Sequence, residues 1–288
     1  MNESKVWLIT GASSGFGRLM TELTLAKGNI VVATARRPET LDDLKEKYSS
    51  DQLLVLECDV TNKQDITNTF STIYKTFGHL DVVFNNAACF YIAEVEHQDQ
   101  DNEARGLFEV NFWGAANIAR EAVAAFRDLN PPGKGGLLLT VGSHCAHGVA
   151  GVGYYDASKA ALESLMLAMA NELDPTWNIK ISLIIPGTFK TRLLQAGAVP
   201  ILPAHPAYAL NQSLPSIIGR QAFQLGVFPG ADPRKAVAKM YDFSQAENRG
   251  LYFVVGQDGI KTIQGKIESL NTAIKEYGDW SADMEMYS

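Results

Sequence analysis

Residues 5–17 read Lys-Val-Trp-Leu-Ile-Thr-Gly-Ala-Ser-Ser-Gly-Phe-Gly, an apolar run that ends in a glycine-rich loop. The run Val6–Thr10 predicts a β-strand, and the residues from Gly17 to Lys27 predict a helix. A backbone that turns tightly, lets a phosphate approach and starts a helix against a sheet needs glycine wherever a Cβ would clash. The order strand, glycine loop, helix therefore predicts a phosphate-binding turn, in which free amide groups and the positive end of the helix dipole face the anion. The alternative is a glycine-rich turn that binds no ligand.

Short apolar strands and longer amphipathic helices alternate along the rest of the chain. Strands that are apolar on both faces are typical of a parallel sheet with helices on both sides. The pattern therefore predicts an α/β fold with a doubly wound parallel sheet. The further predicted strands are Asn29–Thr34, Leu53–Glu57, Leu80–Asn85, Gly136–Val141, Ile179–Ile185 and Leu251–Val255. The further predicted helices are Ile66–Phe77, Asp101–Asp128, Gly153–Leu173, Arg234–Phe243 and Ile260–Tyr277.

The composition fits a globular protein rather than a disordered or coiled-coil chain. Of 288 residues, 46% are hydrophobic and 20% are charged, and the net charge is −7. An acidic surface repels phosphate backbones, so we expect no nucleic-acid partner. No apolar stretch approaches the roughly 18 residues that a spanning helix needs, so we expect no membrane span. Because α/β chains of this length often fold as one unit, we expect a single domain over residues 1–288.

The cysteines and the N-terminus indicate where the protein resides. Cys58, Cys89 and Cys145 are too few and too widely spaced for a disulfide framework. The N-terminus reaches an apolar strand at once and lacks the features of a secretory leader. We therefore expect a cytoplasmic protein with reduced thiols. The sequence contains no CxxC or HExxH motif, so we expect no metal site.

The segment Thr10–Gly17 has the spacing Thr-Gly-x-x-x-Gly-x-Gly and resembles the glycine motif of the short-chain dehydrogenase/reductase family. The epimerase-like branch of that family would have glycine where Ser14 stands, so the resemblance favours the compact oxidoreductase branch. The resemblance extends over about residues 5–260. It implies a Rossmann fold, a nicotinamide cofactor, a small-molecule substrate, and assembly as a homodimer or homotetramer.

The end of the second strand indicates which nicotinamide cofactor binds. NAD sites of this topology place Asp or Glu there, where it accepts hydrogen bonds from the ribose hydroxyls. Here Ala35 occupies the position, and Arg36 and Arg37 follow it. A guanidinium binds a 2′-phosphate through charge-assisted, often bidentate hydrogen bonds. We therefore expect NADP(H), with Arg36 as the main contact and Arg37 in support. The alternatives are two solvated surface arginines and an enzyme that uses NAD.

Three further segments resemble cofactor motifs of the family. Asp59 stands where the family has an Asp that contacts the adenine, and Pro186–Thr191 matches the family's Pro-Gly-x-x-x-Thr. Asn85–Ala88 resembles the family's Asn-Asn-Ala-Gly, with Ala88 in place of the glycine. The residues expected to contact the cofactor are Gly11, Ser13, Ser14, Gly15, Phe16, Gly17, Arg36, Arg37, Asp59, Val60, Asn86, Ala87, Tyr155, Lys159, Pro186, Gly187, Phe189 and Thr191.

Tyr155 and Lys159 have the spacing Tyr-x-x-x-Lys, which places both on one face of a helix with their Cβ atoms about 5–6 Å apart. A free tyrosine has a pKa near 10, too high for efficient proton exchange at neutral pH. We expect the Lys159 ammonium and an oxidised nicotinamide to lower the pKa of Tyr155, so that its phenol acts as a general acid or base. Tyr154 lacks such a partner, because Ser158 stands four residues after it. The alternative is an amphipathic helix with a buried tyrosine.

The resemblance adds a serine and an asparagine to this pair. Ser143 follows a predicted strand, and it would hold the substrate oxygen beside the phenol. Asn111 lies in a segment that resembles the family's asparagine helix, and it would anchor a water next to Lys159. Ser143 precedes Tyr155 by 12 residues, about one fewer than in most members, which we interpret as a shortened loop. The residues expected to be catalytic are Asn111, Ser143, Tyr155 and Lys159.

Residues 188–230 are rich in Pro, Ala and Leu and show no regular period. We expect a lid over the substrate, with a long segment packed on the core as the alternative. Its apolar side chains suit an apolar carbonyl or alcohol. Residues 258–288 are expected to form a C-terminal helical extension. The apolar side chains expected in the lid are Leu193, Leu194, Val199, Ile201, Leu202, Tyr208, Leu210 and Phe223.

The motifs together predict an NADP(H)-dependent oxidoreductase that reduces a ketone or aldehyde, or oxidises the corresponding alcohol. His144, Cys145 and His147 follow Ser143 and are expected to line the pocket rather than to bind a metal. A different class of function stays open, in which the protein binds the cofactor as a redox sensor or scaffold with little turnover.

Overall fold

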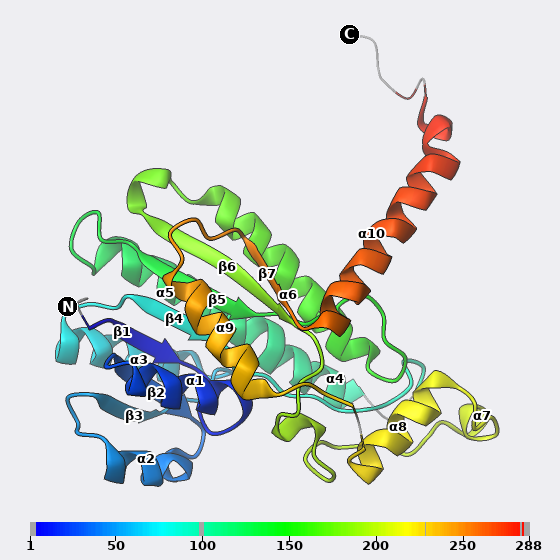
Figure 1. Ribbon diagram of the computed structural model, residues 1–288, viewed down its shortest axis with the longest axis horizontal. Coiled ribbons are helices and arrows are strands. Elements are labelled where there is room, and N and C mark those ends of the chain that lie inside the picture. The colour runs from blue at the N-terminus through cyan, green and yellow to red at the C-terminus, as the bar shows by residue number, and fades with distance from the viewer. Residues whose placement is uncertain (1–3, 98–100, 228, 283, 285–288) are drawn as a thin grey trace.

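The computed structural model describes residues 4–97, 101–227, 229–282 and 284, and it contains a seven-stranded sheet (Figure 1). The strands are β1 Val6–Ile9, β2 Ile30–Ala35, β3 Leu53–Glu57, β4 Val82–Asn85, β5 Gly136–Val141, β6 Ile179–Pro186 and β7 Tyr252–Val255. Their order is β3-β2-β1-β4-β5-β6-β7, and every neighbouring pair is parallel. The order runs outward in both directions from β1 and β4, which confirms the predicted doubly wound α/β fold.

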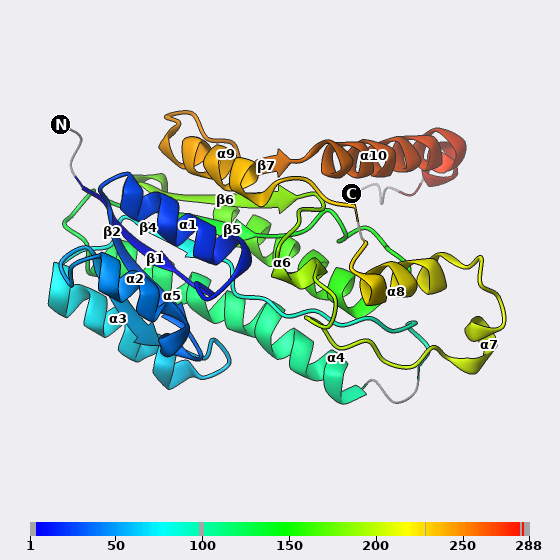
Figure 2. The same cartoon turned by 60° about the horizontal axis from the view of Figure 1, so that its bottom comes forward.

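Helices cover both faces of this sheet (Figure 2). They are α1 Gly15–Ala26, α2 Asp42–Lys47, α3 Lys63–Phe77, α4 Asp101–Phe108, α5 Ala115–Asp128, α6 Gly153–Glu172, α7 Pro206–Ala209, α8 Pro215–Leu225, α9 Pro233–Gln245 and α10 Gln257–Tyr277. Side chains of α1 and α9 pack on one face, and those of α3, α5 and α6 pack on the other. This arrangement explains why the strands are apolar on both sides.

Consecutive residues of β1 serve opposite faces of the sheet. Trp7 and Ile9 belong to the same core as Met20 of α1 and Met240 of α9, whereas Leu8 belongs to the core under the other helices. All three strand residues are fully buried. Burial of one large apolar side chain stabilises a fold by about 1.5–3 kcal/mol. The two cores therefore hold the strands, and with them the loops at the carboxyl ends of the strands.

The long helix predicted for Asp101–Asp128 is interrupted in its middle. Glu109–Gly114 form a π-helical segment between α4 and α5. Gly114 lies against Val60, and a Cβ on this glycine would approach a side-chain carbon of Val60 to 2.7 Å. Single π turns inside α-helices are frequent at functional sites, and this one contains Asn111.

The region after β6 is more structured than its sequence pattern indicated. The segment 188–230 contains the helices α7 and α8, both of which begin with proline, a residue that favours the first helical position. The long helix α10 lies in the segment expected to form a C-terminal extension and projects from the body (Figures 1 and 2). Residues 228, 283 and 285–288 of these two predicted segments lie outside the described residues. No helix among the described residues is long and apolar enough to cross a membrane.

Candidate active site

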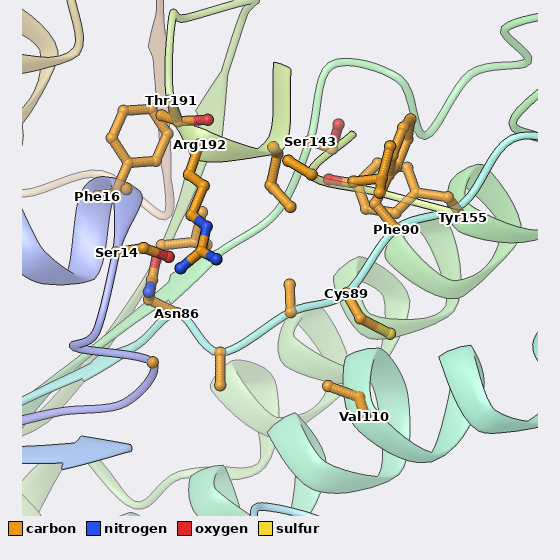
Figure 3. A pocket seen from close by; sticks show the side chains of 18 of the residues that line it. Ser14, Phe16, Asn86, Cys89, Phe90, Val110, Ser143, Tyr155, Thr191 and Arg192 are labelled. Atoms are coloured by element: carbon orange, nitrogen blue, oxygen red, sulfur yellow. The ribbon is translucent and has the colours of Figure 1, made fainter. Parts of the chain in front are cut away.

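A cavity of about 540 Å³ opens at the carboxyl ends of the strands, beside the point where the strand order reverses between β1 and β4. Figure 3 shows part of its wall. The residues expected to contact a cofactor all line this cavity except Gly17. Of the residues expected to be catalytic, Ser143, Tyr155 and Lys159 line it, and Asn111 lies behind the wall. The structure thus brings together residues that are far apart in the sequence.

The loop after Ser143 contributes two of its three expected lining residues. His144 and Cys145 line the cavity, whereas His147 does not. Burial raises the pKa of the Cys145 thiol to about 12, so this thiol stays protonated at neutral pH. The described part of the chain contains no cluster of His, Cys, Asp and Glu that could hold a metal ion.

The glycine loop brings β1, α1 and the end of β4 into close contact. Gly11 and Gly15 have φ of +65° and +56°, which favour glycine, and a Cβ on Gly17 would approach the carbonyl oxygen of Gly11 to 2.3 Å. Asn86 braces this turn, since its side-chain nitrogen donates to the carbonyl oxygen of Thr10 over 2.9 Å. The Thr10 hydroxyl in turn accepts the backbone N–H of Asn86 over 2.9 Å. The Asn86 side chain therefore shapes the loop that a phosphate would approach.

The arginines at the end of β2 lie where the sequence predicted them. Arg36 and Arg37 are exposed and line the cavity, whereas Ala35 is buried. Burial raises the pKa of the Cys89 thiol, and the charges of Lys159 and Arg36 oppose that rise.

Tyr155 and Ser143 meet on one side of the cavity (Figure 3). Tyr155 lies in the first turn of α6, and the Ser143 hydroxyl is near enough to its phenol to favour the phenolate. Ser143 also accepts the backbone N–H of Cys145 over 3.1 Å, which fixes its side chain at the end of β5. The ring of Phe90 packs edge-on against the ring of Tyr155, with 4.9 Å between centroids. The shortened loop thus still places a serine hydroxyl beside the phenol.

Burial dominates the electrostatics of Tyr155 within the protein. It raises the pKa of Tyr155 above its usual value, although the nearby Ser143 hydroxyl acts in the opposite direction. Lys159 is also buried, which lowers the pKa of its ammonium to about 8, and its Nζ donates to the carbonyl oxygen of Val141 over 2.8 Å. Among the protein groups, desolvation of the phenolate therefore outweighs the nearby favourable interactions. The expected lowering of the Tyr155 pKa by Lys159 together with an oxidised nicotinamide stays a prediction.

Asn111 uses its amide group to hold the backbone of Cys89. Its Oδ1 accepts the Cys89 N–H over 2.8 Å, and its Nδ2 donates to the Cys89 carbonyl oxygen over 2.9 Å. The same nitrogen donates to the Ser158 hydroxyl over 3.2 Å. The π-helical segment therefore fixes the backbone of Cys89, which lies in one wall of the cavity. The expected role of Asn111 in anchoring a water beside Lys159 stays a prediction.

The sequence analysis missed Asp258, which lies in the first turn of α10. Its Oδ2 accepts the backbone N–H of Thr188 over 2.6 Å. A Cβ on Gly187 would approach the Asp258 Oδ1 to 2.1 Å, so only glycine leaves room for this contact. On the other side of the turn, His144 Nδ1 lies 3.0 Å from the carbonyl oxygen of Pro186. An acidic residue in the first turn of a helix is typical of helix stabilisation, so no separate signal for this contact was present in the sequence.

A second missed feature is a buried ion pair between Glu94 and Arg220. The Arg220 Nη2 lies 2.9 and 2.7 Å from the two Glu94 carboxylate oxygens, and both side chains are buried. Burial alone would raise the pKa of Glu94, but the hydrogen bonds from Arg220 and nearby backbone groups hold it below its usual value. The same guanidinium donates to the carbonyl oxygen of Leu202. The pair therefore ties α8 and the segment before it to the loop after β4.

Apolar side chains form the part of the cavity beyond Tyr155. The ring of Phe223 from α8 lies 5.5 Å from the ring of Phe90, centroid to centroid. Among the residues expected in the lid, those that line the cavity are Leu193, Leu194, Val199 and Phe223. Ile201, Leu202 and Tyr208 do not line it, and Leu210 is 89% exposed. Four of the eight apolar side chains expected in the lid therefore reach the cavity wall, and the other four do not.

Comparisons with known proteins agree with the family resemblance of the sequence motifs. The sequence matches the family model described as short chain dehydrogenase over residues 5–198. An uncharacterised oxidoreductase of Schizosaccharomyces pombe is 31% identical over 277 residues, which cover 93% of this chain and 87% of that protein. The crystal structure of a short-chain dehydrogenase from Streptomyces avermitilis is 32% identical and gives a TM-score of 0.87, covering 99% of this chain and 100% of that chain.

Two more distant structures share the fold and contain cofactors. A Burkholderia cenocepacia protein in complex with NADP is 22% identical with a TM-score of 0.71, covering 95% of this chain and 97% of that chain. A Burkholderia phymatum protein in complex with NAD is 22% identical with a TM-score of 0.74, covering 99% of this chain and 98% of that chain. Neighbours of this fold therefore bind nicotinamide cofactors of both kinds.

Proposed function

This chain belongs to the short-chain dehydrogenase/reductase family of oxidoreductases, and we propose that it uses NADP(H) to interconvert a carbonyl compound and an alcohol. The observation that carries the proposal is that Ser143 and Tyr155 lie together on the wall of a cavity whose opposite end holds a glycine loop and two arginines. The end with the glycine loop and the arginines suits a dinucleotide, and the end with Ser143 and Tyr155 suits a proton transfer.

The residues at the glycine loop fit a pyrophosphate. Gly11 and Gly15 provide a left-handed backbone, and α1, which is 12 residues long, directs its positive end toward the loop. The first turn of α1 contains no acidic residue that would repel an anion. Ser13 and Ser14 add hydroxyl groups to the cavity wall. Phe16 and Thr191 lie together at this end of the cavity (Figure 3).

The cofactor preference follows from the charges at the end of β2. Arg36 and Arg37 are exposed and would bind the 2′-phosphate of NADP(H) through charge-assisted hydrogen bonds. Ala35 offers no carboxylate to accept hydrogen bonds from the ribose hydroxyls of NAD. Asp59 would contact the adenine from the end of β3, where it already accepts hydrogen bonds from Thr61.

The side chains around Tyr155 fit the proton transfer of such a reaction. When bound, the nicotinamide supplies or accepts the hydride. The Ser143 hydroxyl holds the substrate oxygen, and the Tyr155 phenol donates its proton to that oxygen as the alcohol forms. Because burial keeps the pKa of Tyr155 high, the phenol is protonated at neutral pH and ready to act as an acid. Lys159, whose pKa is about 8, restores that proton.

The apolar wall suggests the class of substrate. Phe90, Val199 and Phe223 line the cavity beyond the reacting oxygen. An apolar wall of this kind suits an aliphatic or aromatic ketone or alcohol better than a charged substrate. The segment 188–230 would then act as a lid, since Val199 and Phe223 both belong to it.

The cofactor proposal is tested by the Arg36→Ala variant. We expect wild type to bind NADPH more tightly than NADH, because only NADPH carries the 2′-phosphate. The variant should lose about 10- to 100-fold in affinity for NADPH, the size of one or two charge-assisted hydrogen bonds, and keep its affinity for NADH. Titration of cofactor fluorescence measures both constants. Arg234→Ala, an exposed arginine on α9, is the matched control. Equal wild-type affinities for the two cofactors would remove the NADP(H) assignment.

The activity is tested by following NADPH absorbance with a panel of ketones and aldehydes, and NADP⁺ reduction with the matching alcohols. We expect turnover on apolar members of the panel. The second candidate function, a cofactor-binding sensor or scaffold, is favoured only by Ala88 in place of the family glycine. It predicts cofactor binding without turnover on any member of the panel.

A further inference from the structure

The Arg192 side chain projects into the cavity from the segment 188–230. It lines the cavity, and Figure 3 shows its guanidinium directed toward the side chains of Ser14 and Asn86. Both of these side chains belong to the end of the cavity that the glycine loop forms, whereas the reacting side chains lie at the other end. Arg192 therefore adds a cation to the glycine-loop end, from a segment that is remote from the loop in the sequence.

The backbone that carries Arg192 is fixed against the start of α1. Thr191 packs there, since a Cβ on Gly15 would lie 3.6 Å from the Thr191 Cβ. The ring of Phe189 contacts the ring of Phe16 edge-on, with 5.6 Å between their centroids. Arg192 itself begins a short 3₁₀ turn. The point from which the guanidinium extends is therefore held beside the glycine loop.

The Arg192 guanidinium has no acidic partner among the residues that the structure describes. Other arginines differ in this respect. The Arg220 guanidinium is paired with the Glu94 carboxylate. Arg18 and Arg127 also have carboxylate partners. The positive charge of Arg192 and its planar set of N–H donors are therefore available to a ligand in the cavity.

The wall of the cavity is positively charged although the chain as a whole is acidic. The net charge of the chain is −7. The residues that line the cavity nevertheless include four cations and a single carboxylate, that of Asp59. A cleft lined by one sign of charge concentrates ligands of the opposite sign. The excess therefore favours a ligand with several negative charges. The four cations are Arg36, Arg37, Lys159 and Arg192.

The proposed function uses three of these cations and leaves the fourth without a role. Arg36 and Arg37 lie at the end of β2, where they would bind the 2′-phosphate, and Lys159 lies beside the proton donor. The pyrophosphate would meet only neutral groups at the glycine loop, namely backbone N–H groups and serine hydroxyls. Arg192 is the cation whose guanidinium points toward this place (Figure 3).

We propose that Arg192 binds the pyrophosphate of the dinucleotide, so that the anion lies between the glycine loop and the guanidinium. A guanidinium binds phosphate oxygens through bidentate, charge-assisted hydrogen bonds. The inference rests on the proposed use of a nicotinamide dinucleotide. It is independent of the preference for NADP(H), because NAD(H) contains the same pyrophosphate.

An acidic group on the substrate is the alternative partner for Arg192. The substrate oxygen would lie at Ser143 and Tyr155, at the other end of the cavity from the guanidinium (Figure 3). The apolar wall formed by Phe90 and Phe223 lies beyond that oxygen. The position of Arg192 therefore favours the cofactor, and binding measured without substrate separates the two partners.

The test measures dinucleotide affinity by isothermal titration calorimetry in the absence of substrate. We expect Arg192→Ala to lose about 10- to 100-fold in affinity for NADPH and for NADH alike, the size of one or two charge-assisted hydrogen bonds. Arg192→Lys should recover part of this loss, because it keeps the charge and lacks the planar fork. The matched control is Lys190→Ala, which removes an exposed cation of the same segment that does not line the cavity. It should keep the wild-type affinities.

Fragments of the cofactor locate the contact. ADP-ribose contains the pyrophosphate without the 2′-phosphate, and 2′-AMP contains the 2′-phosphate without the pyrophosphate. We expect Arg192→Ala to weaken the binding of ADP-ribose and to leave that of 2′-AMP unchanged. Arg36→Ala should have the reverse effect.

The outcomes separate this inference from the proposed function. Wild-type affinity of Arg192→Ala for both dinucleotides would overturn the inference and leave the proposed function standing. A loss of affinity for NADPH and 2′-AMP alone would place Arg192 at the 2′-phosphate and would also overturn it. A wild-type protein that binds neither dinucleotide would overturn the proposed function, and the inference with it.

Discussion

The cofactor side and the substrate side of the cavity are built in different ways. The cofactor side consists of short turns at strand ends, whose geometry comes from glycines such as Gly11 and Gly15 and from bonds between near neighbours in the fold. The substrate side joins the loop after β4 to a segment more than 100 residues later, through the Glu94–Arg220 pair. The difference teaches that the cofactor side is shaped mainly by tight turns at strand ends, whereas the substrate side is held by contacts between segments more than 100 residues apart, among them the Glu94–Arg220 pair and the bonds between Ile92 and residues 200 and 202.

The largest expected effect concerns the reacting centre, where the two sides meet. Tyr155→Phe removes the proton donor and keeps the ring packing against Phe90. We expect kcat to fall by about 100- to 10,000-fold, the usual contribution of a positioned acid, with little change in NADPH affinity. Steady-state kinetics and cofactor titration measure the two quantities.

Tyr154→Phe is the matched control, because Tyr154 neighbours the proposed acid but has Ser158 rather than lysine one turn later. It should keep nearly the wild-type kcat. Wild-type turnover in Tyr155→Phe would mean that another group donates the proton.

The next largest effect concerns the contact that holds the substrate side. Glu94→Ala leaves the buried Arg220 guanidinium without its carboxylate, so we expect unfolding free energy to fall by about 3–5 kcal/mol. Replacing both partners, as in Glu94→Leu/Arg220→Met, should restore most of this loss. Urea unfolding measures the difference.

The control is Asp242→Ala, which removes the exposed partner of Lys239, 3.8 Å away, and should cost less than about 1 kcal/mol. If Glu94→Ala costs no more than this control, the long-range contact does not hold the substrate side.

A smaller, pH-dependent effect is expected from Asp156, which follows Tyr155. Burial raises its pKa from 3.8 to about 7, and its Oδ2 accepts the N–H of Val149 over 2.5 Å. Between these two pKa values the folded protein binds more protons than the unfolded chain, so stability falls as pH rises from about 4 to 7. The loss is at most about 4 kcal/mol.

Asp156→Asn cannot ionise and keeps an oxygen for Val149. Urea unfolding at pH 4.5 and pH 7.5 should therefore show a smaller loss of stability for the variant than for wild type. Equal losses in the two proteins would assign the pH dependence to other groups.

The smallest expected effect sharpens the description of the cofactor side. Asp258→Ala removes the acceptor for the Thr188 N–H, so the turn at Gly187 becomes less fixed. We expect the KM for NADPH to rise by about 3- to 10-fold, the size of one hydrogen bond, while kcat changes less. Asp258→Asn should recover part of the loss, because its amide oxygen can accept the same N–H.

The exposed Glu268→Ala on the same helix is the control for Asp258. A loss of kcat with an unchanged KM would show that Asp258 acts on the chemistry rather than on the turn.

The features of the molecule that could be predicted from the sequence are those determined by residues close together in the chain. The strands, the glycine loop and the Tyr155–Lys159 spacing follow from short-range sterics and from the helical repeat, so they could be read residue by residue. The direction in which the pKa of Tyr155 shifts could not be predicted in this way. It depends on burial by groups such as Phe90 that are distant from Tyr155 in the sequence. Asp258 and Arg220 were also missed, since their partners are 70 and 126 residues away.

The central claim is that Tyr155 and Ser143 act on a substrate oxygen next to the nicotinamide. A crystal structure with NADP⁺ and a bound alcohol or ketone tests it most directly. The account predicts that the substrate oxygen lies within hydrogen-bond distance of the Tyr155 and Ser143 hydroxyls, with the nicotinamide ring beside it and the 2′-phosphate at Arg36. A nicotinamide ring bound away from Tyr155, in a crystal that also holds substrate, would contradict it.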